Sequence, residues 1–172
     1  MAWFRTLWSL HRWFGLAVGA VLVVTAGTGF LLLVKKHYAW LQPPVVRGEA
    51  GPPAALRPLA EVYDAVFALG VPELRSEADI ARIDFRPAQR VHKVISVHGD
   101  VEVQVCATTL RTSGPAVRHS DWLERLHDGS WFGDWMHGWV MPAVAVALLF
   151  LALSGYVMWG WPKWQRWRRR RD

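Results

Sequence analysis

The chain lacks charge in two long stretches, and it lacks tryptophan over most of the region that separates them. None of its twelve tryptophans lies between Trp40 and Trp122. A single cysteine, Cys106, excludes an internal disulfide. The sequence also contains no Gly-rich phosphate loop, no nucleophile–base pair and no paired carboxylates. These absences leave no residues that indicate hydrolytic chemistry or a soluble-enzyme site.

The two uncharged stretches are residues 15–34 and 138–161. At about 1.5 Å per residue, a helix of twenty residues extends about 30 Å, which is the thickness of a hydrocarbon core. We therefore predict two transmembrane helices. A signal peptide is the alternative for the first stretch, but its apolar run is too long and no small-x-small cleavage pattern follows it.

The tryptophans support this prediction because they border both stretches. Indole has a large apolar body and one polar N–H, so it concentrates where hydrocarbon meets lipid headgroups. The bordering residues are Trp3, Trp8, Trp13 and Trp40 around the first stretch, and Trp131, Trp135, Trp139, Trp159, Trp161, Trp164 and Trp167 around the second. Each stretch thus has an aromatic belt at both ends.

Basic residues near the ends predict the orientation. Residues 162–172 carry six Lys or Arg, and such residues resist translocation. We expect a bacterial inner-membrane protein with both termini in the cytoplasm and the central region in the periplasm or outside the cell. The net charge of +6 comes from the membrane edges. Because the basic tail follows a span and contains tryptophan, it indicates contact with anionic lipid and not with nucleic acid.

The central region predicts a small α+β domain. Residues 41–57 form a Pro- and Gly-rich linker, and residues 58–119 show a helical pattern over 59–69 followed by strand patterns over 80–85, 91–97 and 101–107. Val101, Val103 and Val105 should share one face of the sheet. The expected fold class is a membrane α-helical protein with two transmembrane helices and this extramembrane module. We divide the rest into residues 1–40, 120–137, 138–161 and 162–172.

Two motifs resemble those of a known family. The segments LHRWFGLAVG at residues 10–19 and RLHDGSWFGDW at residues 125–135 resemble the PepSY-associated transmembrane helix family, as does the order of span, module and span. The acidic residue that this family places before the turn after its last strand is replaced here by Thr108-Thr109. Some larger members of that family are haem-containing inner-membrane reductases that act on ferric siderophores and have four spans in one chain, so this chain resembles about half of that arrangement.

Four of the seven histidines lie in or beside the aromatic belts: His11, His37, His127 and His137. A b-type haem needs two neutral imidazoles at equal membrane depth. His37 and His137 are the depth-matched pair, and His127 replaces either one if its helix folds back onto the membrane. His11 has no partner within one chain, so a homodimer is needed to supply a second copy. The competing interpretation is that these rings only extend to water or to lipid phosphate.

Two functions follow from these observations. The first is transmembrane electron transfer through haem b, with a ferric chelate as the acceptor, which would make the chain a component of a reductase. The second is an anchored PepSY module that acts without redox chemistry as an accessory or regulatory subunit of a larger membrane complex. A transporter role is disfavoured because neither span contains a charged residue.

Overall fold

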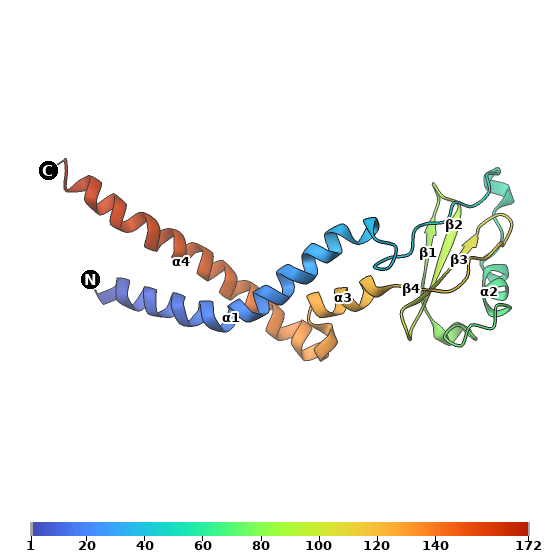
Figure 1. The fold of residues 1–172 in the computed structure, drawn as a ribbon, viewed down its shortest axis with the longest axis horizontal. Helices are drawn as coiled ribbons and strands as arrows, with labels where there is room; N and C mark the ends of the chain where they lie inside the picture. Colours follow the sequence, from blue (N-terminus) through green and yellow to red (C-terminus); the bar gives the residue numbers. More distant parts are fainter. Residues whose placement is uncertain (1, 172) are drawn as a thin grey trace. The chain divides into compact units, whose positions relative to one another are not determined.

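The computed structural model describes residues 2–171, and the chain divides into two compact units. The helical unit contains the residues up to Leu31 and those from Glu124 onward, and the sheet unit is Leu32–Leu123. Figure 1 shows the elements of both along the chain. The predicted fold class is confirmed, because two long apolar helices flank a small antiparallel α+β domain.

Both spans lie in helices that are longer than their uncharged stretches. Helix α1 is Ala2–Val34 and helix α4 is Met141–Arg168, which a single π-helical segment, Met136–Val140, precedes. Pro142 occupies the first turn of α4, where a missing N–H costs nothing, whereas Pro162 lies inside the helix without ending it. Both helices are long and apolar enough to cross a membrane.

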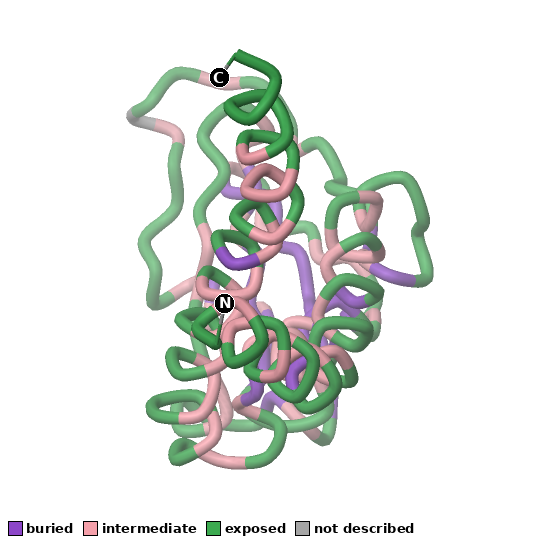
Figure 2. The backbone as a smooth tube through the Cα atoms, turned by 90° about the vertical axis from the view of Figure 1, so that its left-hand side faces the viewer, coloured by how far each residue is buried: buried purple, intermediate pink, exposed green. Residues whose placement is uncertain are grey.

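Most residues of α1 and α4 are exposed or only half-buried, as expected of surfaces that lipid would cover. Figure 2 shows this along the helix that leads to the C-terminus, which is largely green and pink. Three residues of these two helices are buried: Val18, Thr28 and Ser154. The helices touch through aromatic rings, with Phe14 against Phe150 at 5.6 Å between ring centroids. Two of the three buried residues thus carry a hydroxyl group.

The sheet unit contains four antiparallel strands in the order β1-β2-β3-β4. They are β1 (Ile80–Arg86), β2 (Val91–Ser96), β3 (Val101–Cys106) and β4 (Ala116–Val117). The first three agree with the predicted strands to within one residue, whereas β4 was not predicted. Helix α2 (Leu59–Phe67) packs on one face of the sheet, where Val62 and Val66 meet Val94, Val103 and Val105. The predicted alternation of β3 is confirmed, because Val101, Val103 and Val105 lie on the face that packs in this core.

The second face of the sheet is buried as well. The predicted linker lies across it: the N–H of Val46 donates to Gln104 Oε1 at 2.7 Å, and Gln104 Nε2 donates to the carbonyl of Pro44 at 2.8 Å. The alternate residues of β3, Glu102 and Gln104, are consequently 1% and 4% exposed. Segment 43–49 is thus a packed layer of the domain.

Short helical segments complete the connections. Three are 3-10 helices in the sheet unit: Lys35–His37, Pro53–Ala55 and Glu77–Asp79. Helix α3 (His119–His127) follows β4, and the 3-10 helix Ser130–Phe132 follows α3. Gly129 ends α3 with a φ of 79°, a conformation that favours glycine.

Candidate functional site

His127 is held against α1 by two hydrogen bonds. Its Nδ1–H donates to the carbonyl of Thr25 at 3.0 Å and to the hydroxyl of Thr28 at 3.1 Å. The Thr28 hydroxyl donates its own proton to the carbonyl of Val24 at 2.8 Å. Because both partners of Nδ1 act as acceptors, the proton of the neutral ring is on Nδ1 and the lone pair is on Nε2.

A glycine makes room for this ring. A Cβ added at Gly29 would stand 3.1 Å from His127 Cε1, which is tighter than ordinary contact. The end of α3 therefore returns to α1 within the helical unit, about one and a half turns before α1 ends at Val34. From the sequence, His127 was a candidate ligand only if its helix folds back onto the membrane span. The contact between the end of α3 and α1 is consistent with that condition.

His11 has the same arrangement on α4. Its Nδ1 lies 2.7 Å from the hydroxyl of Ser154, and that hydroxyl donates to the carbonyl of Leu151 at 3.1 Å. The Ser154 oxygen thus accepts from Nδ1–H, and the lone pair of the neutral His11 ring is again on Nε2. A Cβ at Gly155 would meet His11 Cε1 at 3.6 Å, so a glycine faces this ring as well.

The two rings lie at different levels of α1. His11 belongs to α1 itself, and His127 contacts Thr28, seventeen residues further along. At about 1.5 Å per residue this separation is about 25 Å. One iron cannot take both rings, since its two axial ligands lie on opposite faces of a single porphyrin. The rings therefore define two separate positions, one toward each end of the apolar run.

His137 lies at the start of the second span. Its Nδ1–H donates to the carbonyl of Asp128 at 2.9 Å, and its side chain is 57% exposed. Burial raises the pKa of Asp128, but hydrogen bonds from Ser130 and the electrostatic attraction of the neighbouring histidines outweigh the effect of burial, so the pKa is lowered. Asp128 is therefore ionised at neutral pH. It accepts a hydrogen bond from His137 through its main-chain carbonyl and interacts electrostatically with both His137 and His127.

His37 is exposed in the 3-10 helix that follows α1 and belongs to the sheet unit. The predicted pairing of His37 with His137 joins residues of the two units, and it stays a prediction. No group of three or more His, Cys, Asp or Glu that suits a metal ion occurs within residues 2–171.

His11 and His127 have the donor chemistry that axial ligands of haem b would need. The iron of a haem accepts the lone pair of a neutral imidazole. A fixed hydrogen-bond acceptor at the other ring nitrogen sets the orientation of that imidazole. Gly155, which faces His11, also lines an apolar groove of about 460 Å³ on α4 together with Leu151, Ala152, Tyr156 and Trp159. His11 and His127 would therefore be the residues that hold haem as axial ligands, and Ser154 and Thr28 would orient their rings through hydrogen bonds.

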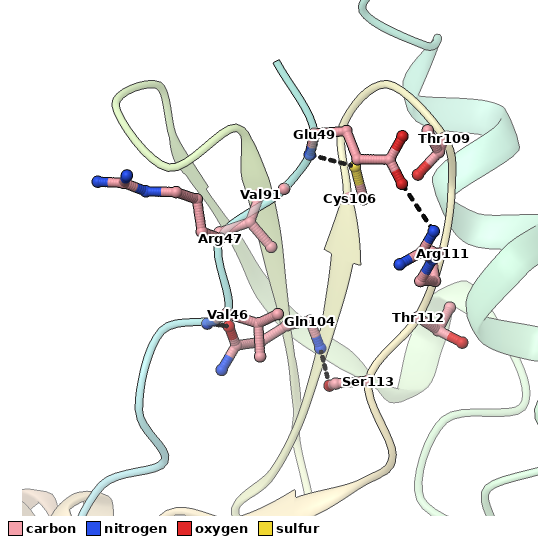
Figure 3. Close-up of a pocket in the computed structure, with 11 residues that line it drawn as sticks. Val46, Arg47, Glu49, Val91, Gln104, Cys106, Thr109, Arg111, Thr112 and Ser113 are labelled. Carbon is pink, nitrogen blue, oxygen red and sulfur yellow. Dashed lines mark hydrogen bonds and ion pairs between the residues drawn. The ribbon is translucent and has the colours of Figure 1, made fainter.

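Cys106 is a feature that sequence reasoning missed. Its sulfur accepts hydrogen bonds from the N–H of Glu49 at 3.3 Å, and Thr108 Oγ1 lies at the same distance. Burial raises the pKa of this thiol, but hydrogen bonds from Thr108, Thr109 and Glu49 lower it to about 6. Figure 3 shows Cys106 among the residues that line a small cavity, with Glu49 next to it and Arg111 paired with Glu49. A lone cysteine carries no sequence signal for such an environment.

One of the comparisons with known proteins identifies a family. The family model described as the PepSY-associated TM region matches residues 8–172, which agrees with the resemblance found in the two motifs. No curated protein and no solved structure matches the chain. The match supports a location in a membrane.

Proposed function

The chain belongs to the PepSY-associated TM region family, and from this premise we propose that it binds haem b in the membrane and carries electrons across it. The observation that supports the proposal most directly is that His11 and His127 have the same tautomer and the same kind of hydrogen-bond partner. Each ring donates from Nδ1 to a held acceptor and keeps its lone pair on Nε2. A histidine that only reaches for water needs neither the buried hydroxyl nor the facing glycine.

We propose that two copies of the chain complete the sites. Each iron needs a second imidazole, and two-fold symmetry about the membrane normal brings the matching histidine of another copy to the same depth. Four helices then surround the haems. Gly15 faces Leu151 of its own chain, but a Cβ at Gly19 would meet nothing within 4 Å, which leaves α1 open to close approach there.

The haem would supply reversible one-electron chemistry, and the residues of this chain hold and orient it. Ser154 and Thr28 fix the ring orientation and raise the basicity of the imidazoles through Nδ1. The separation of about 25 Å along α1 supports two sites near opposite leaflets. We propose that the protein lies in the inner membrane with its sheet unit in the periplasm. The electron donor is then on the cytoplasmic side, and the acceptor on the other side is a ferric chelate.

The test is haem content in the full chain. The protein is purified in mild detergent from haem-sufficient cells, spectra are recorded before and after dithionite, and haem is quantified as the pyridine haemochrome. Two sites shared by two copies predict about one haem per chain. His11→Ala and His127→Ala should each halve this value, whereas His98→Ala, in an exposed turn of the sheet unit, should leave it unchanged.

Other outcomes redirect the assignment. Loss of haem in His37→Ala and His137→Ala, but not in His127→Ala, would move the outer site to that predicted pair. Ser154→Ala should retain haem but shift the reduced bands or the midpoint potential, because the ring loses its acceptor. A folded protein without haem would refute the proposal and favour an anchored module that acts as an accessory subunit.

A further inference from the structure

A polar pocket of the sheet unit lies next to the end of the first span. Its volume is about 340 Å³, and its walls are segment 43–45, Lys36 and Gln42 on one side and Arg86, Gln89 and Lys93 on the other. All of these residues belong to the sheet unit. Three of them are cationic and none is acidic, so the pocket is suited to an anion.

The positive charge of this pocket is only partly compensated. Lys93 Nζ donates to Glu102 Oε1 at 2.8 Å, but Glu102 also pairs with Arg118 through its other oxygen. The Glu102 carboxylate thus serves two buried cations, of which Arg118 has a second carboxylate partner in Asp121 and Lys93 has none. Arg86 lies 3.9 Å from Asp84, and the Arg86 side chain is 52% exposed. An anion in the pocket would complete this arrangement, because a guanidinium group and an ammonium group both favour phosphate oxygens.

Gln42 adds a polar group that lacks a partner. Its Oε1 atom is buried and forms no hydrogen bond with any residue among those the structure describes. The oxygen and nitrogen of a side-chain amide exchange places on rotation, so Gln42 can turn its NH₂ group toward a bound anion. A phosphate oxygen is an acceptor that would satisfy it.

Chain connectivity fixes the depth of this pocket. Lys36 is only two residues beyond Val34, the last residue of α1. Successive Cα atoms are about 3.8 Å apart, so Lys36 cannot be far from the end of the apolar run. In a membrane this is the level of the lipid phosphates.

We propose that this pocket binds the phosphate of an anionic phospholipid, with Lys36, Arg86 and Lys93 as its cationic contacts. The inference is independent of haem, because no histidine contributes to the pocket. A bound headgroup would fasten the sheet unit to the membrane surface beside the first span. Free inorganic phosphate has the same chemistry, and the experiment separates the two sources.

The experiment is native mass spectrometry of the full chain in detergent, with phosphatidylglycerol, phosphatidylcholine or inorganic phosphate added. We expect one retained phosphatidylglycerol per chain, and Arg86→Gln and Lys36→Gln should each weaken it about tenfold, the effect of one lost charge-assisted hydrogen bond. Arg86 and Lys36 are both exposed, so neither change disturbs the core. Matched controls are Arg75→Gln in the sheet unit and Arg169→Gln in the basic tail, which change the net charge equally.

Each outcome decides the question. Selective loss in the two pocket variants supports the lipid site. If Arg169→Gln lowers the retention of phosphatidylglycerol as much as the pocket variants do, the lipid is held by general attraction to the basic tail, and the proposal is overturned. Retention of phosphatidylglycerol that no variant changes overturns it as well. Binding of inorganic phosphate that Arg86→Gln abolishes, without selective lipid retention, overturns the lipid source.

Discussion

Glu102 is the residue on which the buried charges of the sheet unit depend. Its side chain is fully buried, and it accepts hydrogen bonds from Lys93, Gln104 and Arg118. Arg118 has a second acceptor in Asp121, whose Oδ1 lies 3.0 Å from Arg118 Nε. The change Glu102→Gln removes the negative charge, and it turns an NH₂ group toward residues that themselves donate hydrogen bonds to this position. It leaves Lys93, which is 1% exposed, without a counter-ion at its present position.

The expected cost is large because the remaining charges stay buried. Removing one partner of a buried ion pair typically costs about 3–5 kcal/mol. A small domain has a total stability toward the low end of about 5–15 kcal/mol, so the change removes a large part of it. With an m-value of about 1.5 kcal/mol per molar urea, a loss of about 3 kcal/mol lowers the unfolding midpoint by about 2 M.

Cys106 provides the assay. It is the only cysteine of the chain, it ends β3 and it is 7% exposed, so a maleimide reaches it mainly when the sheet opens. Pulse labelling of the full chain in detergent against urea concentration therefore reports unfolding of this unit. Glu61→Gln is the control, since Glu61 forms an exposed pair with Arg57 and should shift the midpoint very little. A midpoint for Glu102→Gln that matches this control would refute the reasoning.

Two further predictions concern the same face of the sheet. Gly48→Ala should lower the labelling midpoint by about 1 M or more, because the new Cβ overlaps the carbonyl oxygen of Arg90, a backbone atom that cannot turn away; Gly114→Ala, where a Cβ meets nothing within 4 Å, is the control. The ultraviolet absorbance of the folded-state Cys106 thiolate should be level above pH 7 and fall as the pH drops through about 6, because the thiolate is then protonated. The lowered pKa also means that this thiolate stabilises the fold at high pH and that its contribution declines as the pH falls from about 9 to about 6; an absorbance that keeps rising to pH 9 would contradict both statements.

Periodicity was sufficient to predict the elements that bury one apolar face. The alternation from Val101 to Val105 and the spacing of Val62 and Val66 follow directly from the geometry of strands and helices. Strand β4 has two residues, Ala116 and Val117, and its ladder depends on tertiary pairing with β3. No pattern can indicate a strand that short.

The second face of the sheet could not be predicted in the same way. In β3 the residues between the valines are Glu102 and Gln104, which a sequence pattern assigns to water. They are buried because segment 43–49 supplies main-chain partners and Arg118 supplies a counter-charge. Proline in that segment predicts the end of a helix but not the surface on which the following residues pack.

The histidines illustrate a related limit. Within an apolar run, Thr28 and Ser154 are compatible with a lipid-facing helix, since a hydroxyl can bond to the carbonyl one turn earlier. The structure buries both and uses the remaining lone pair of each oxygen to receive a histidine Nδ1–H. A hydroxyl that is already committed to its own helix can only accept, so it selects the tautomer of its partner. Small polar residues inside an uncharged span are therefore the positions at which to look for the orienting partner of a histidine elsewhere in the chain.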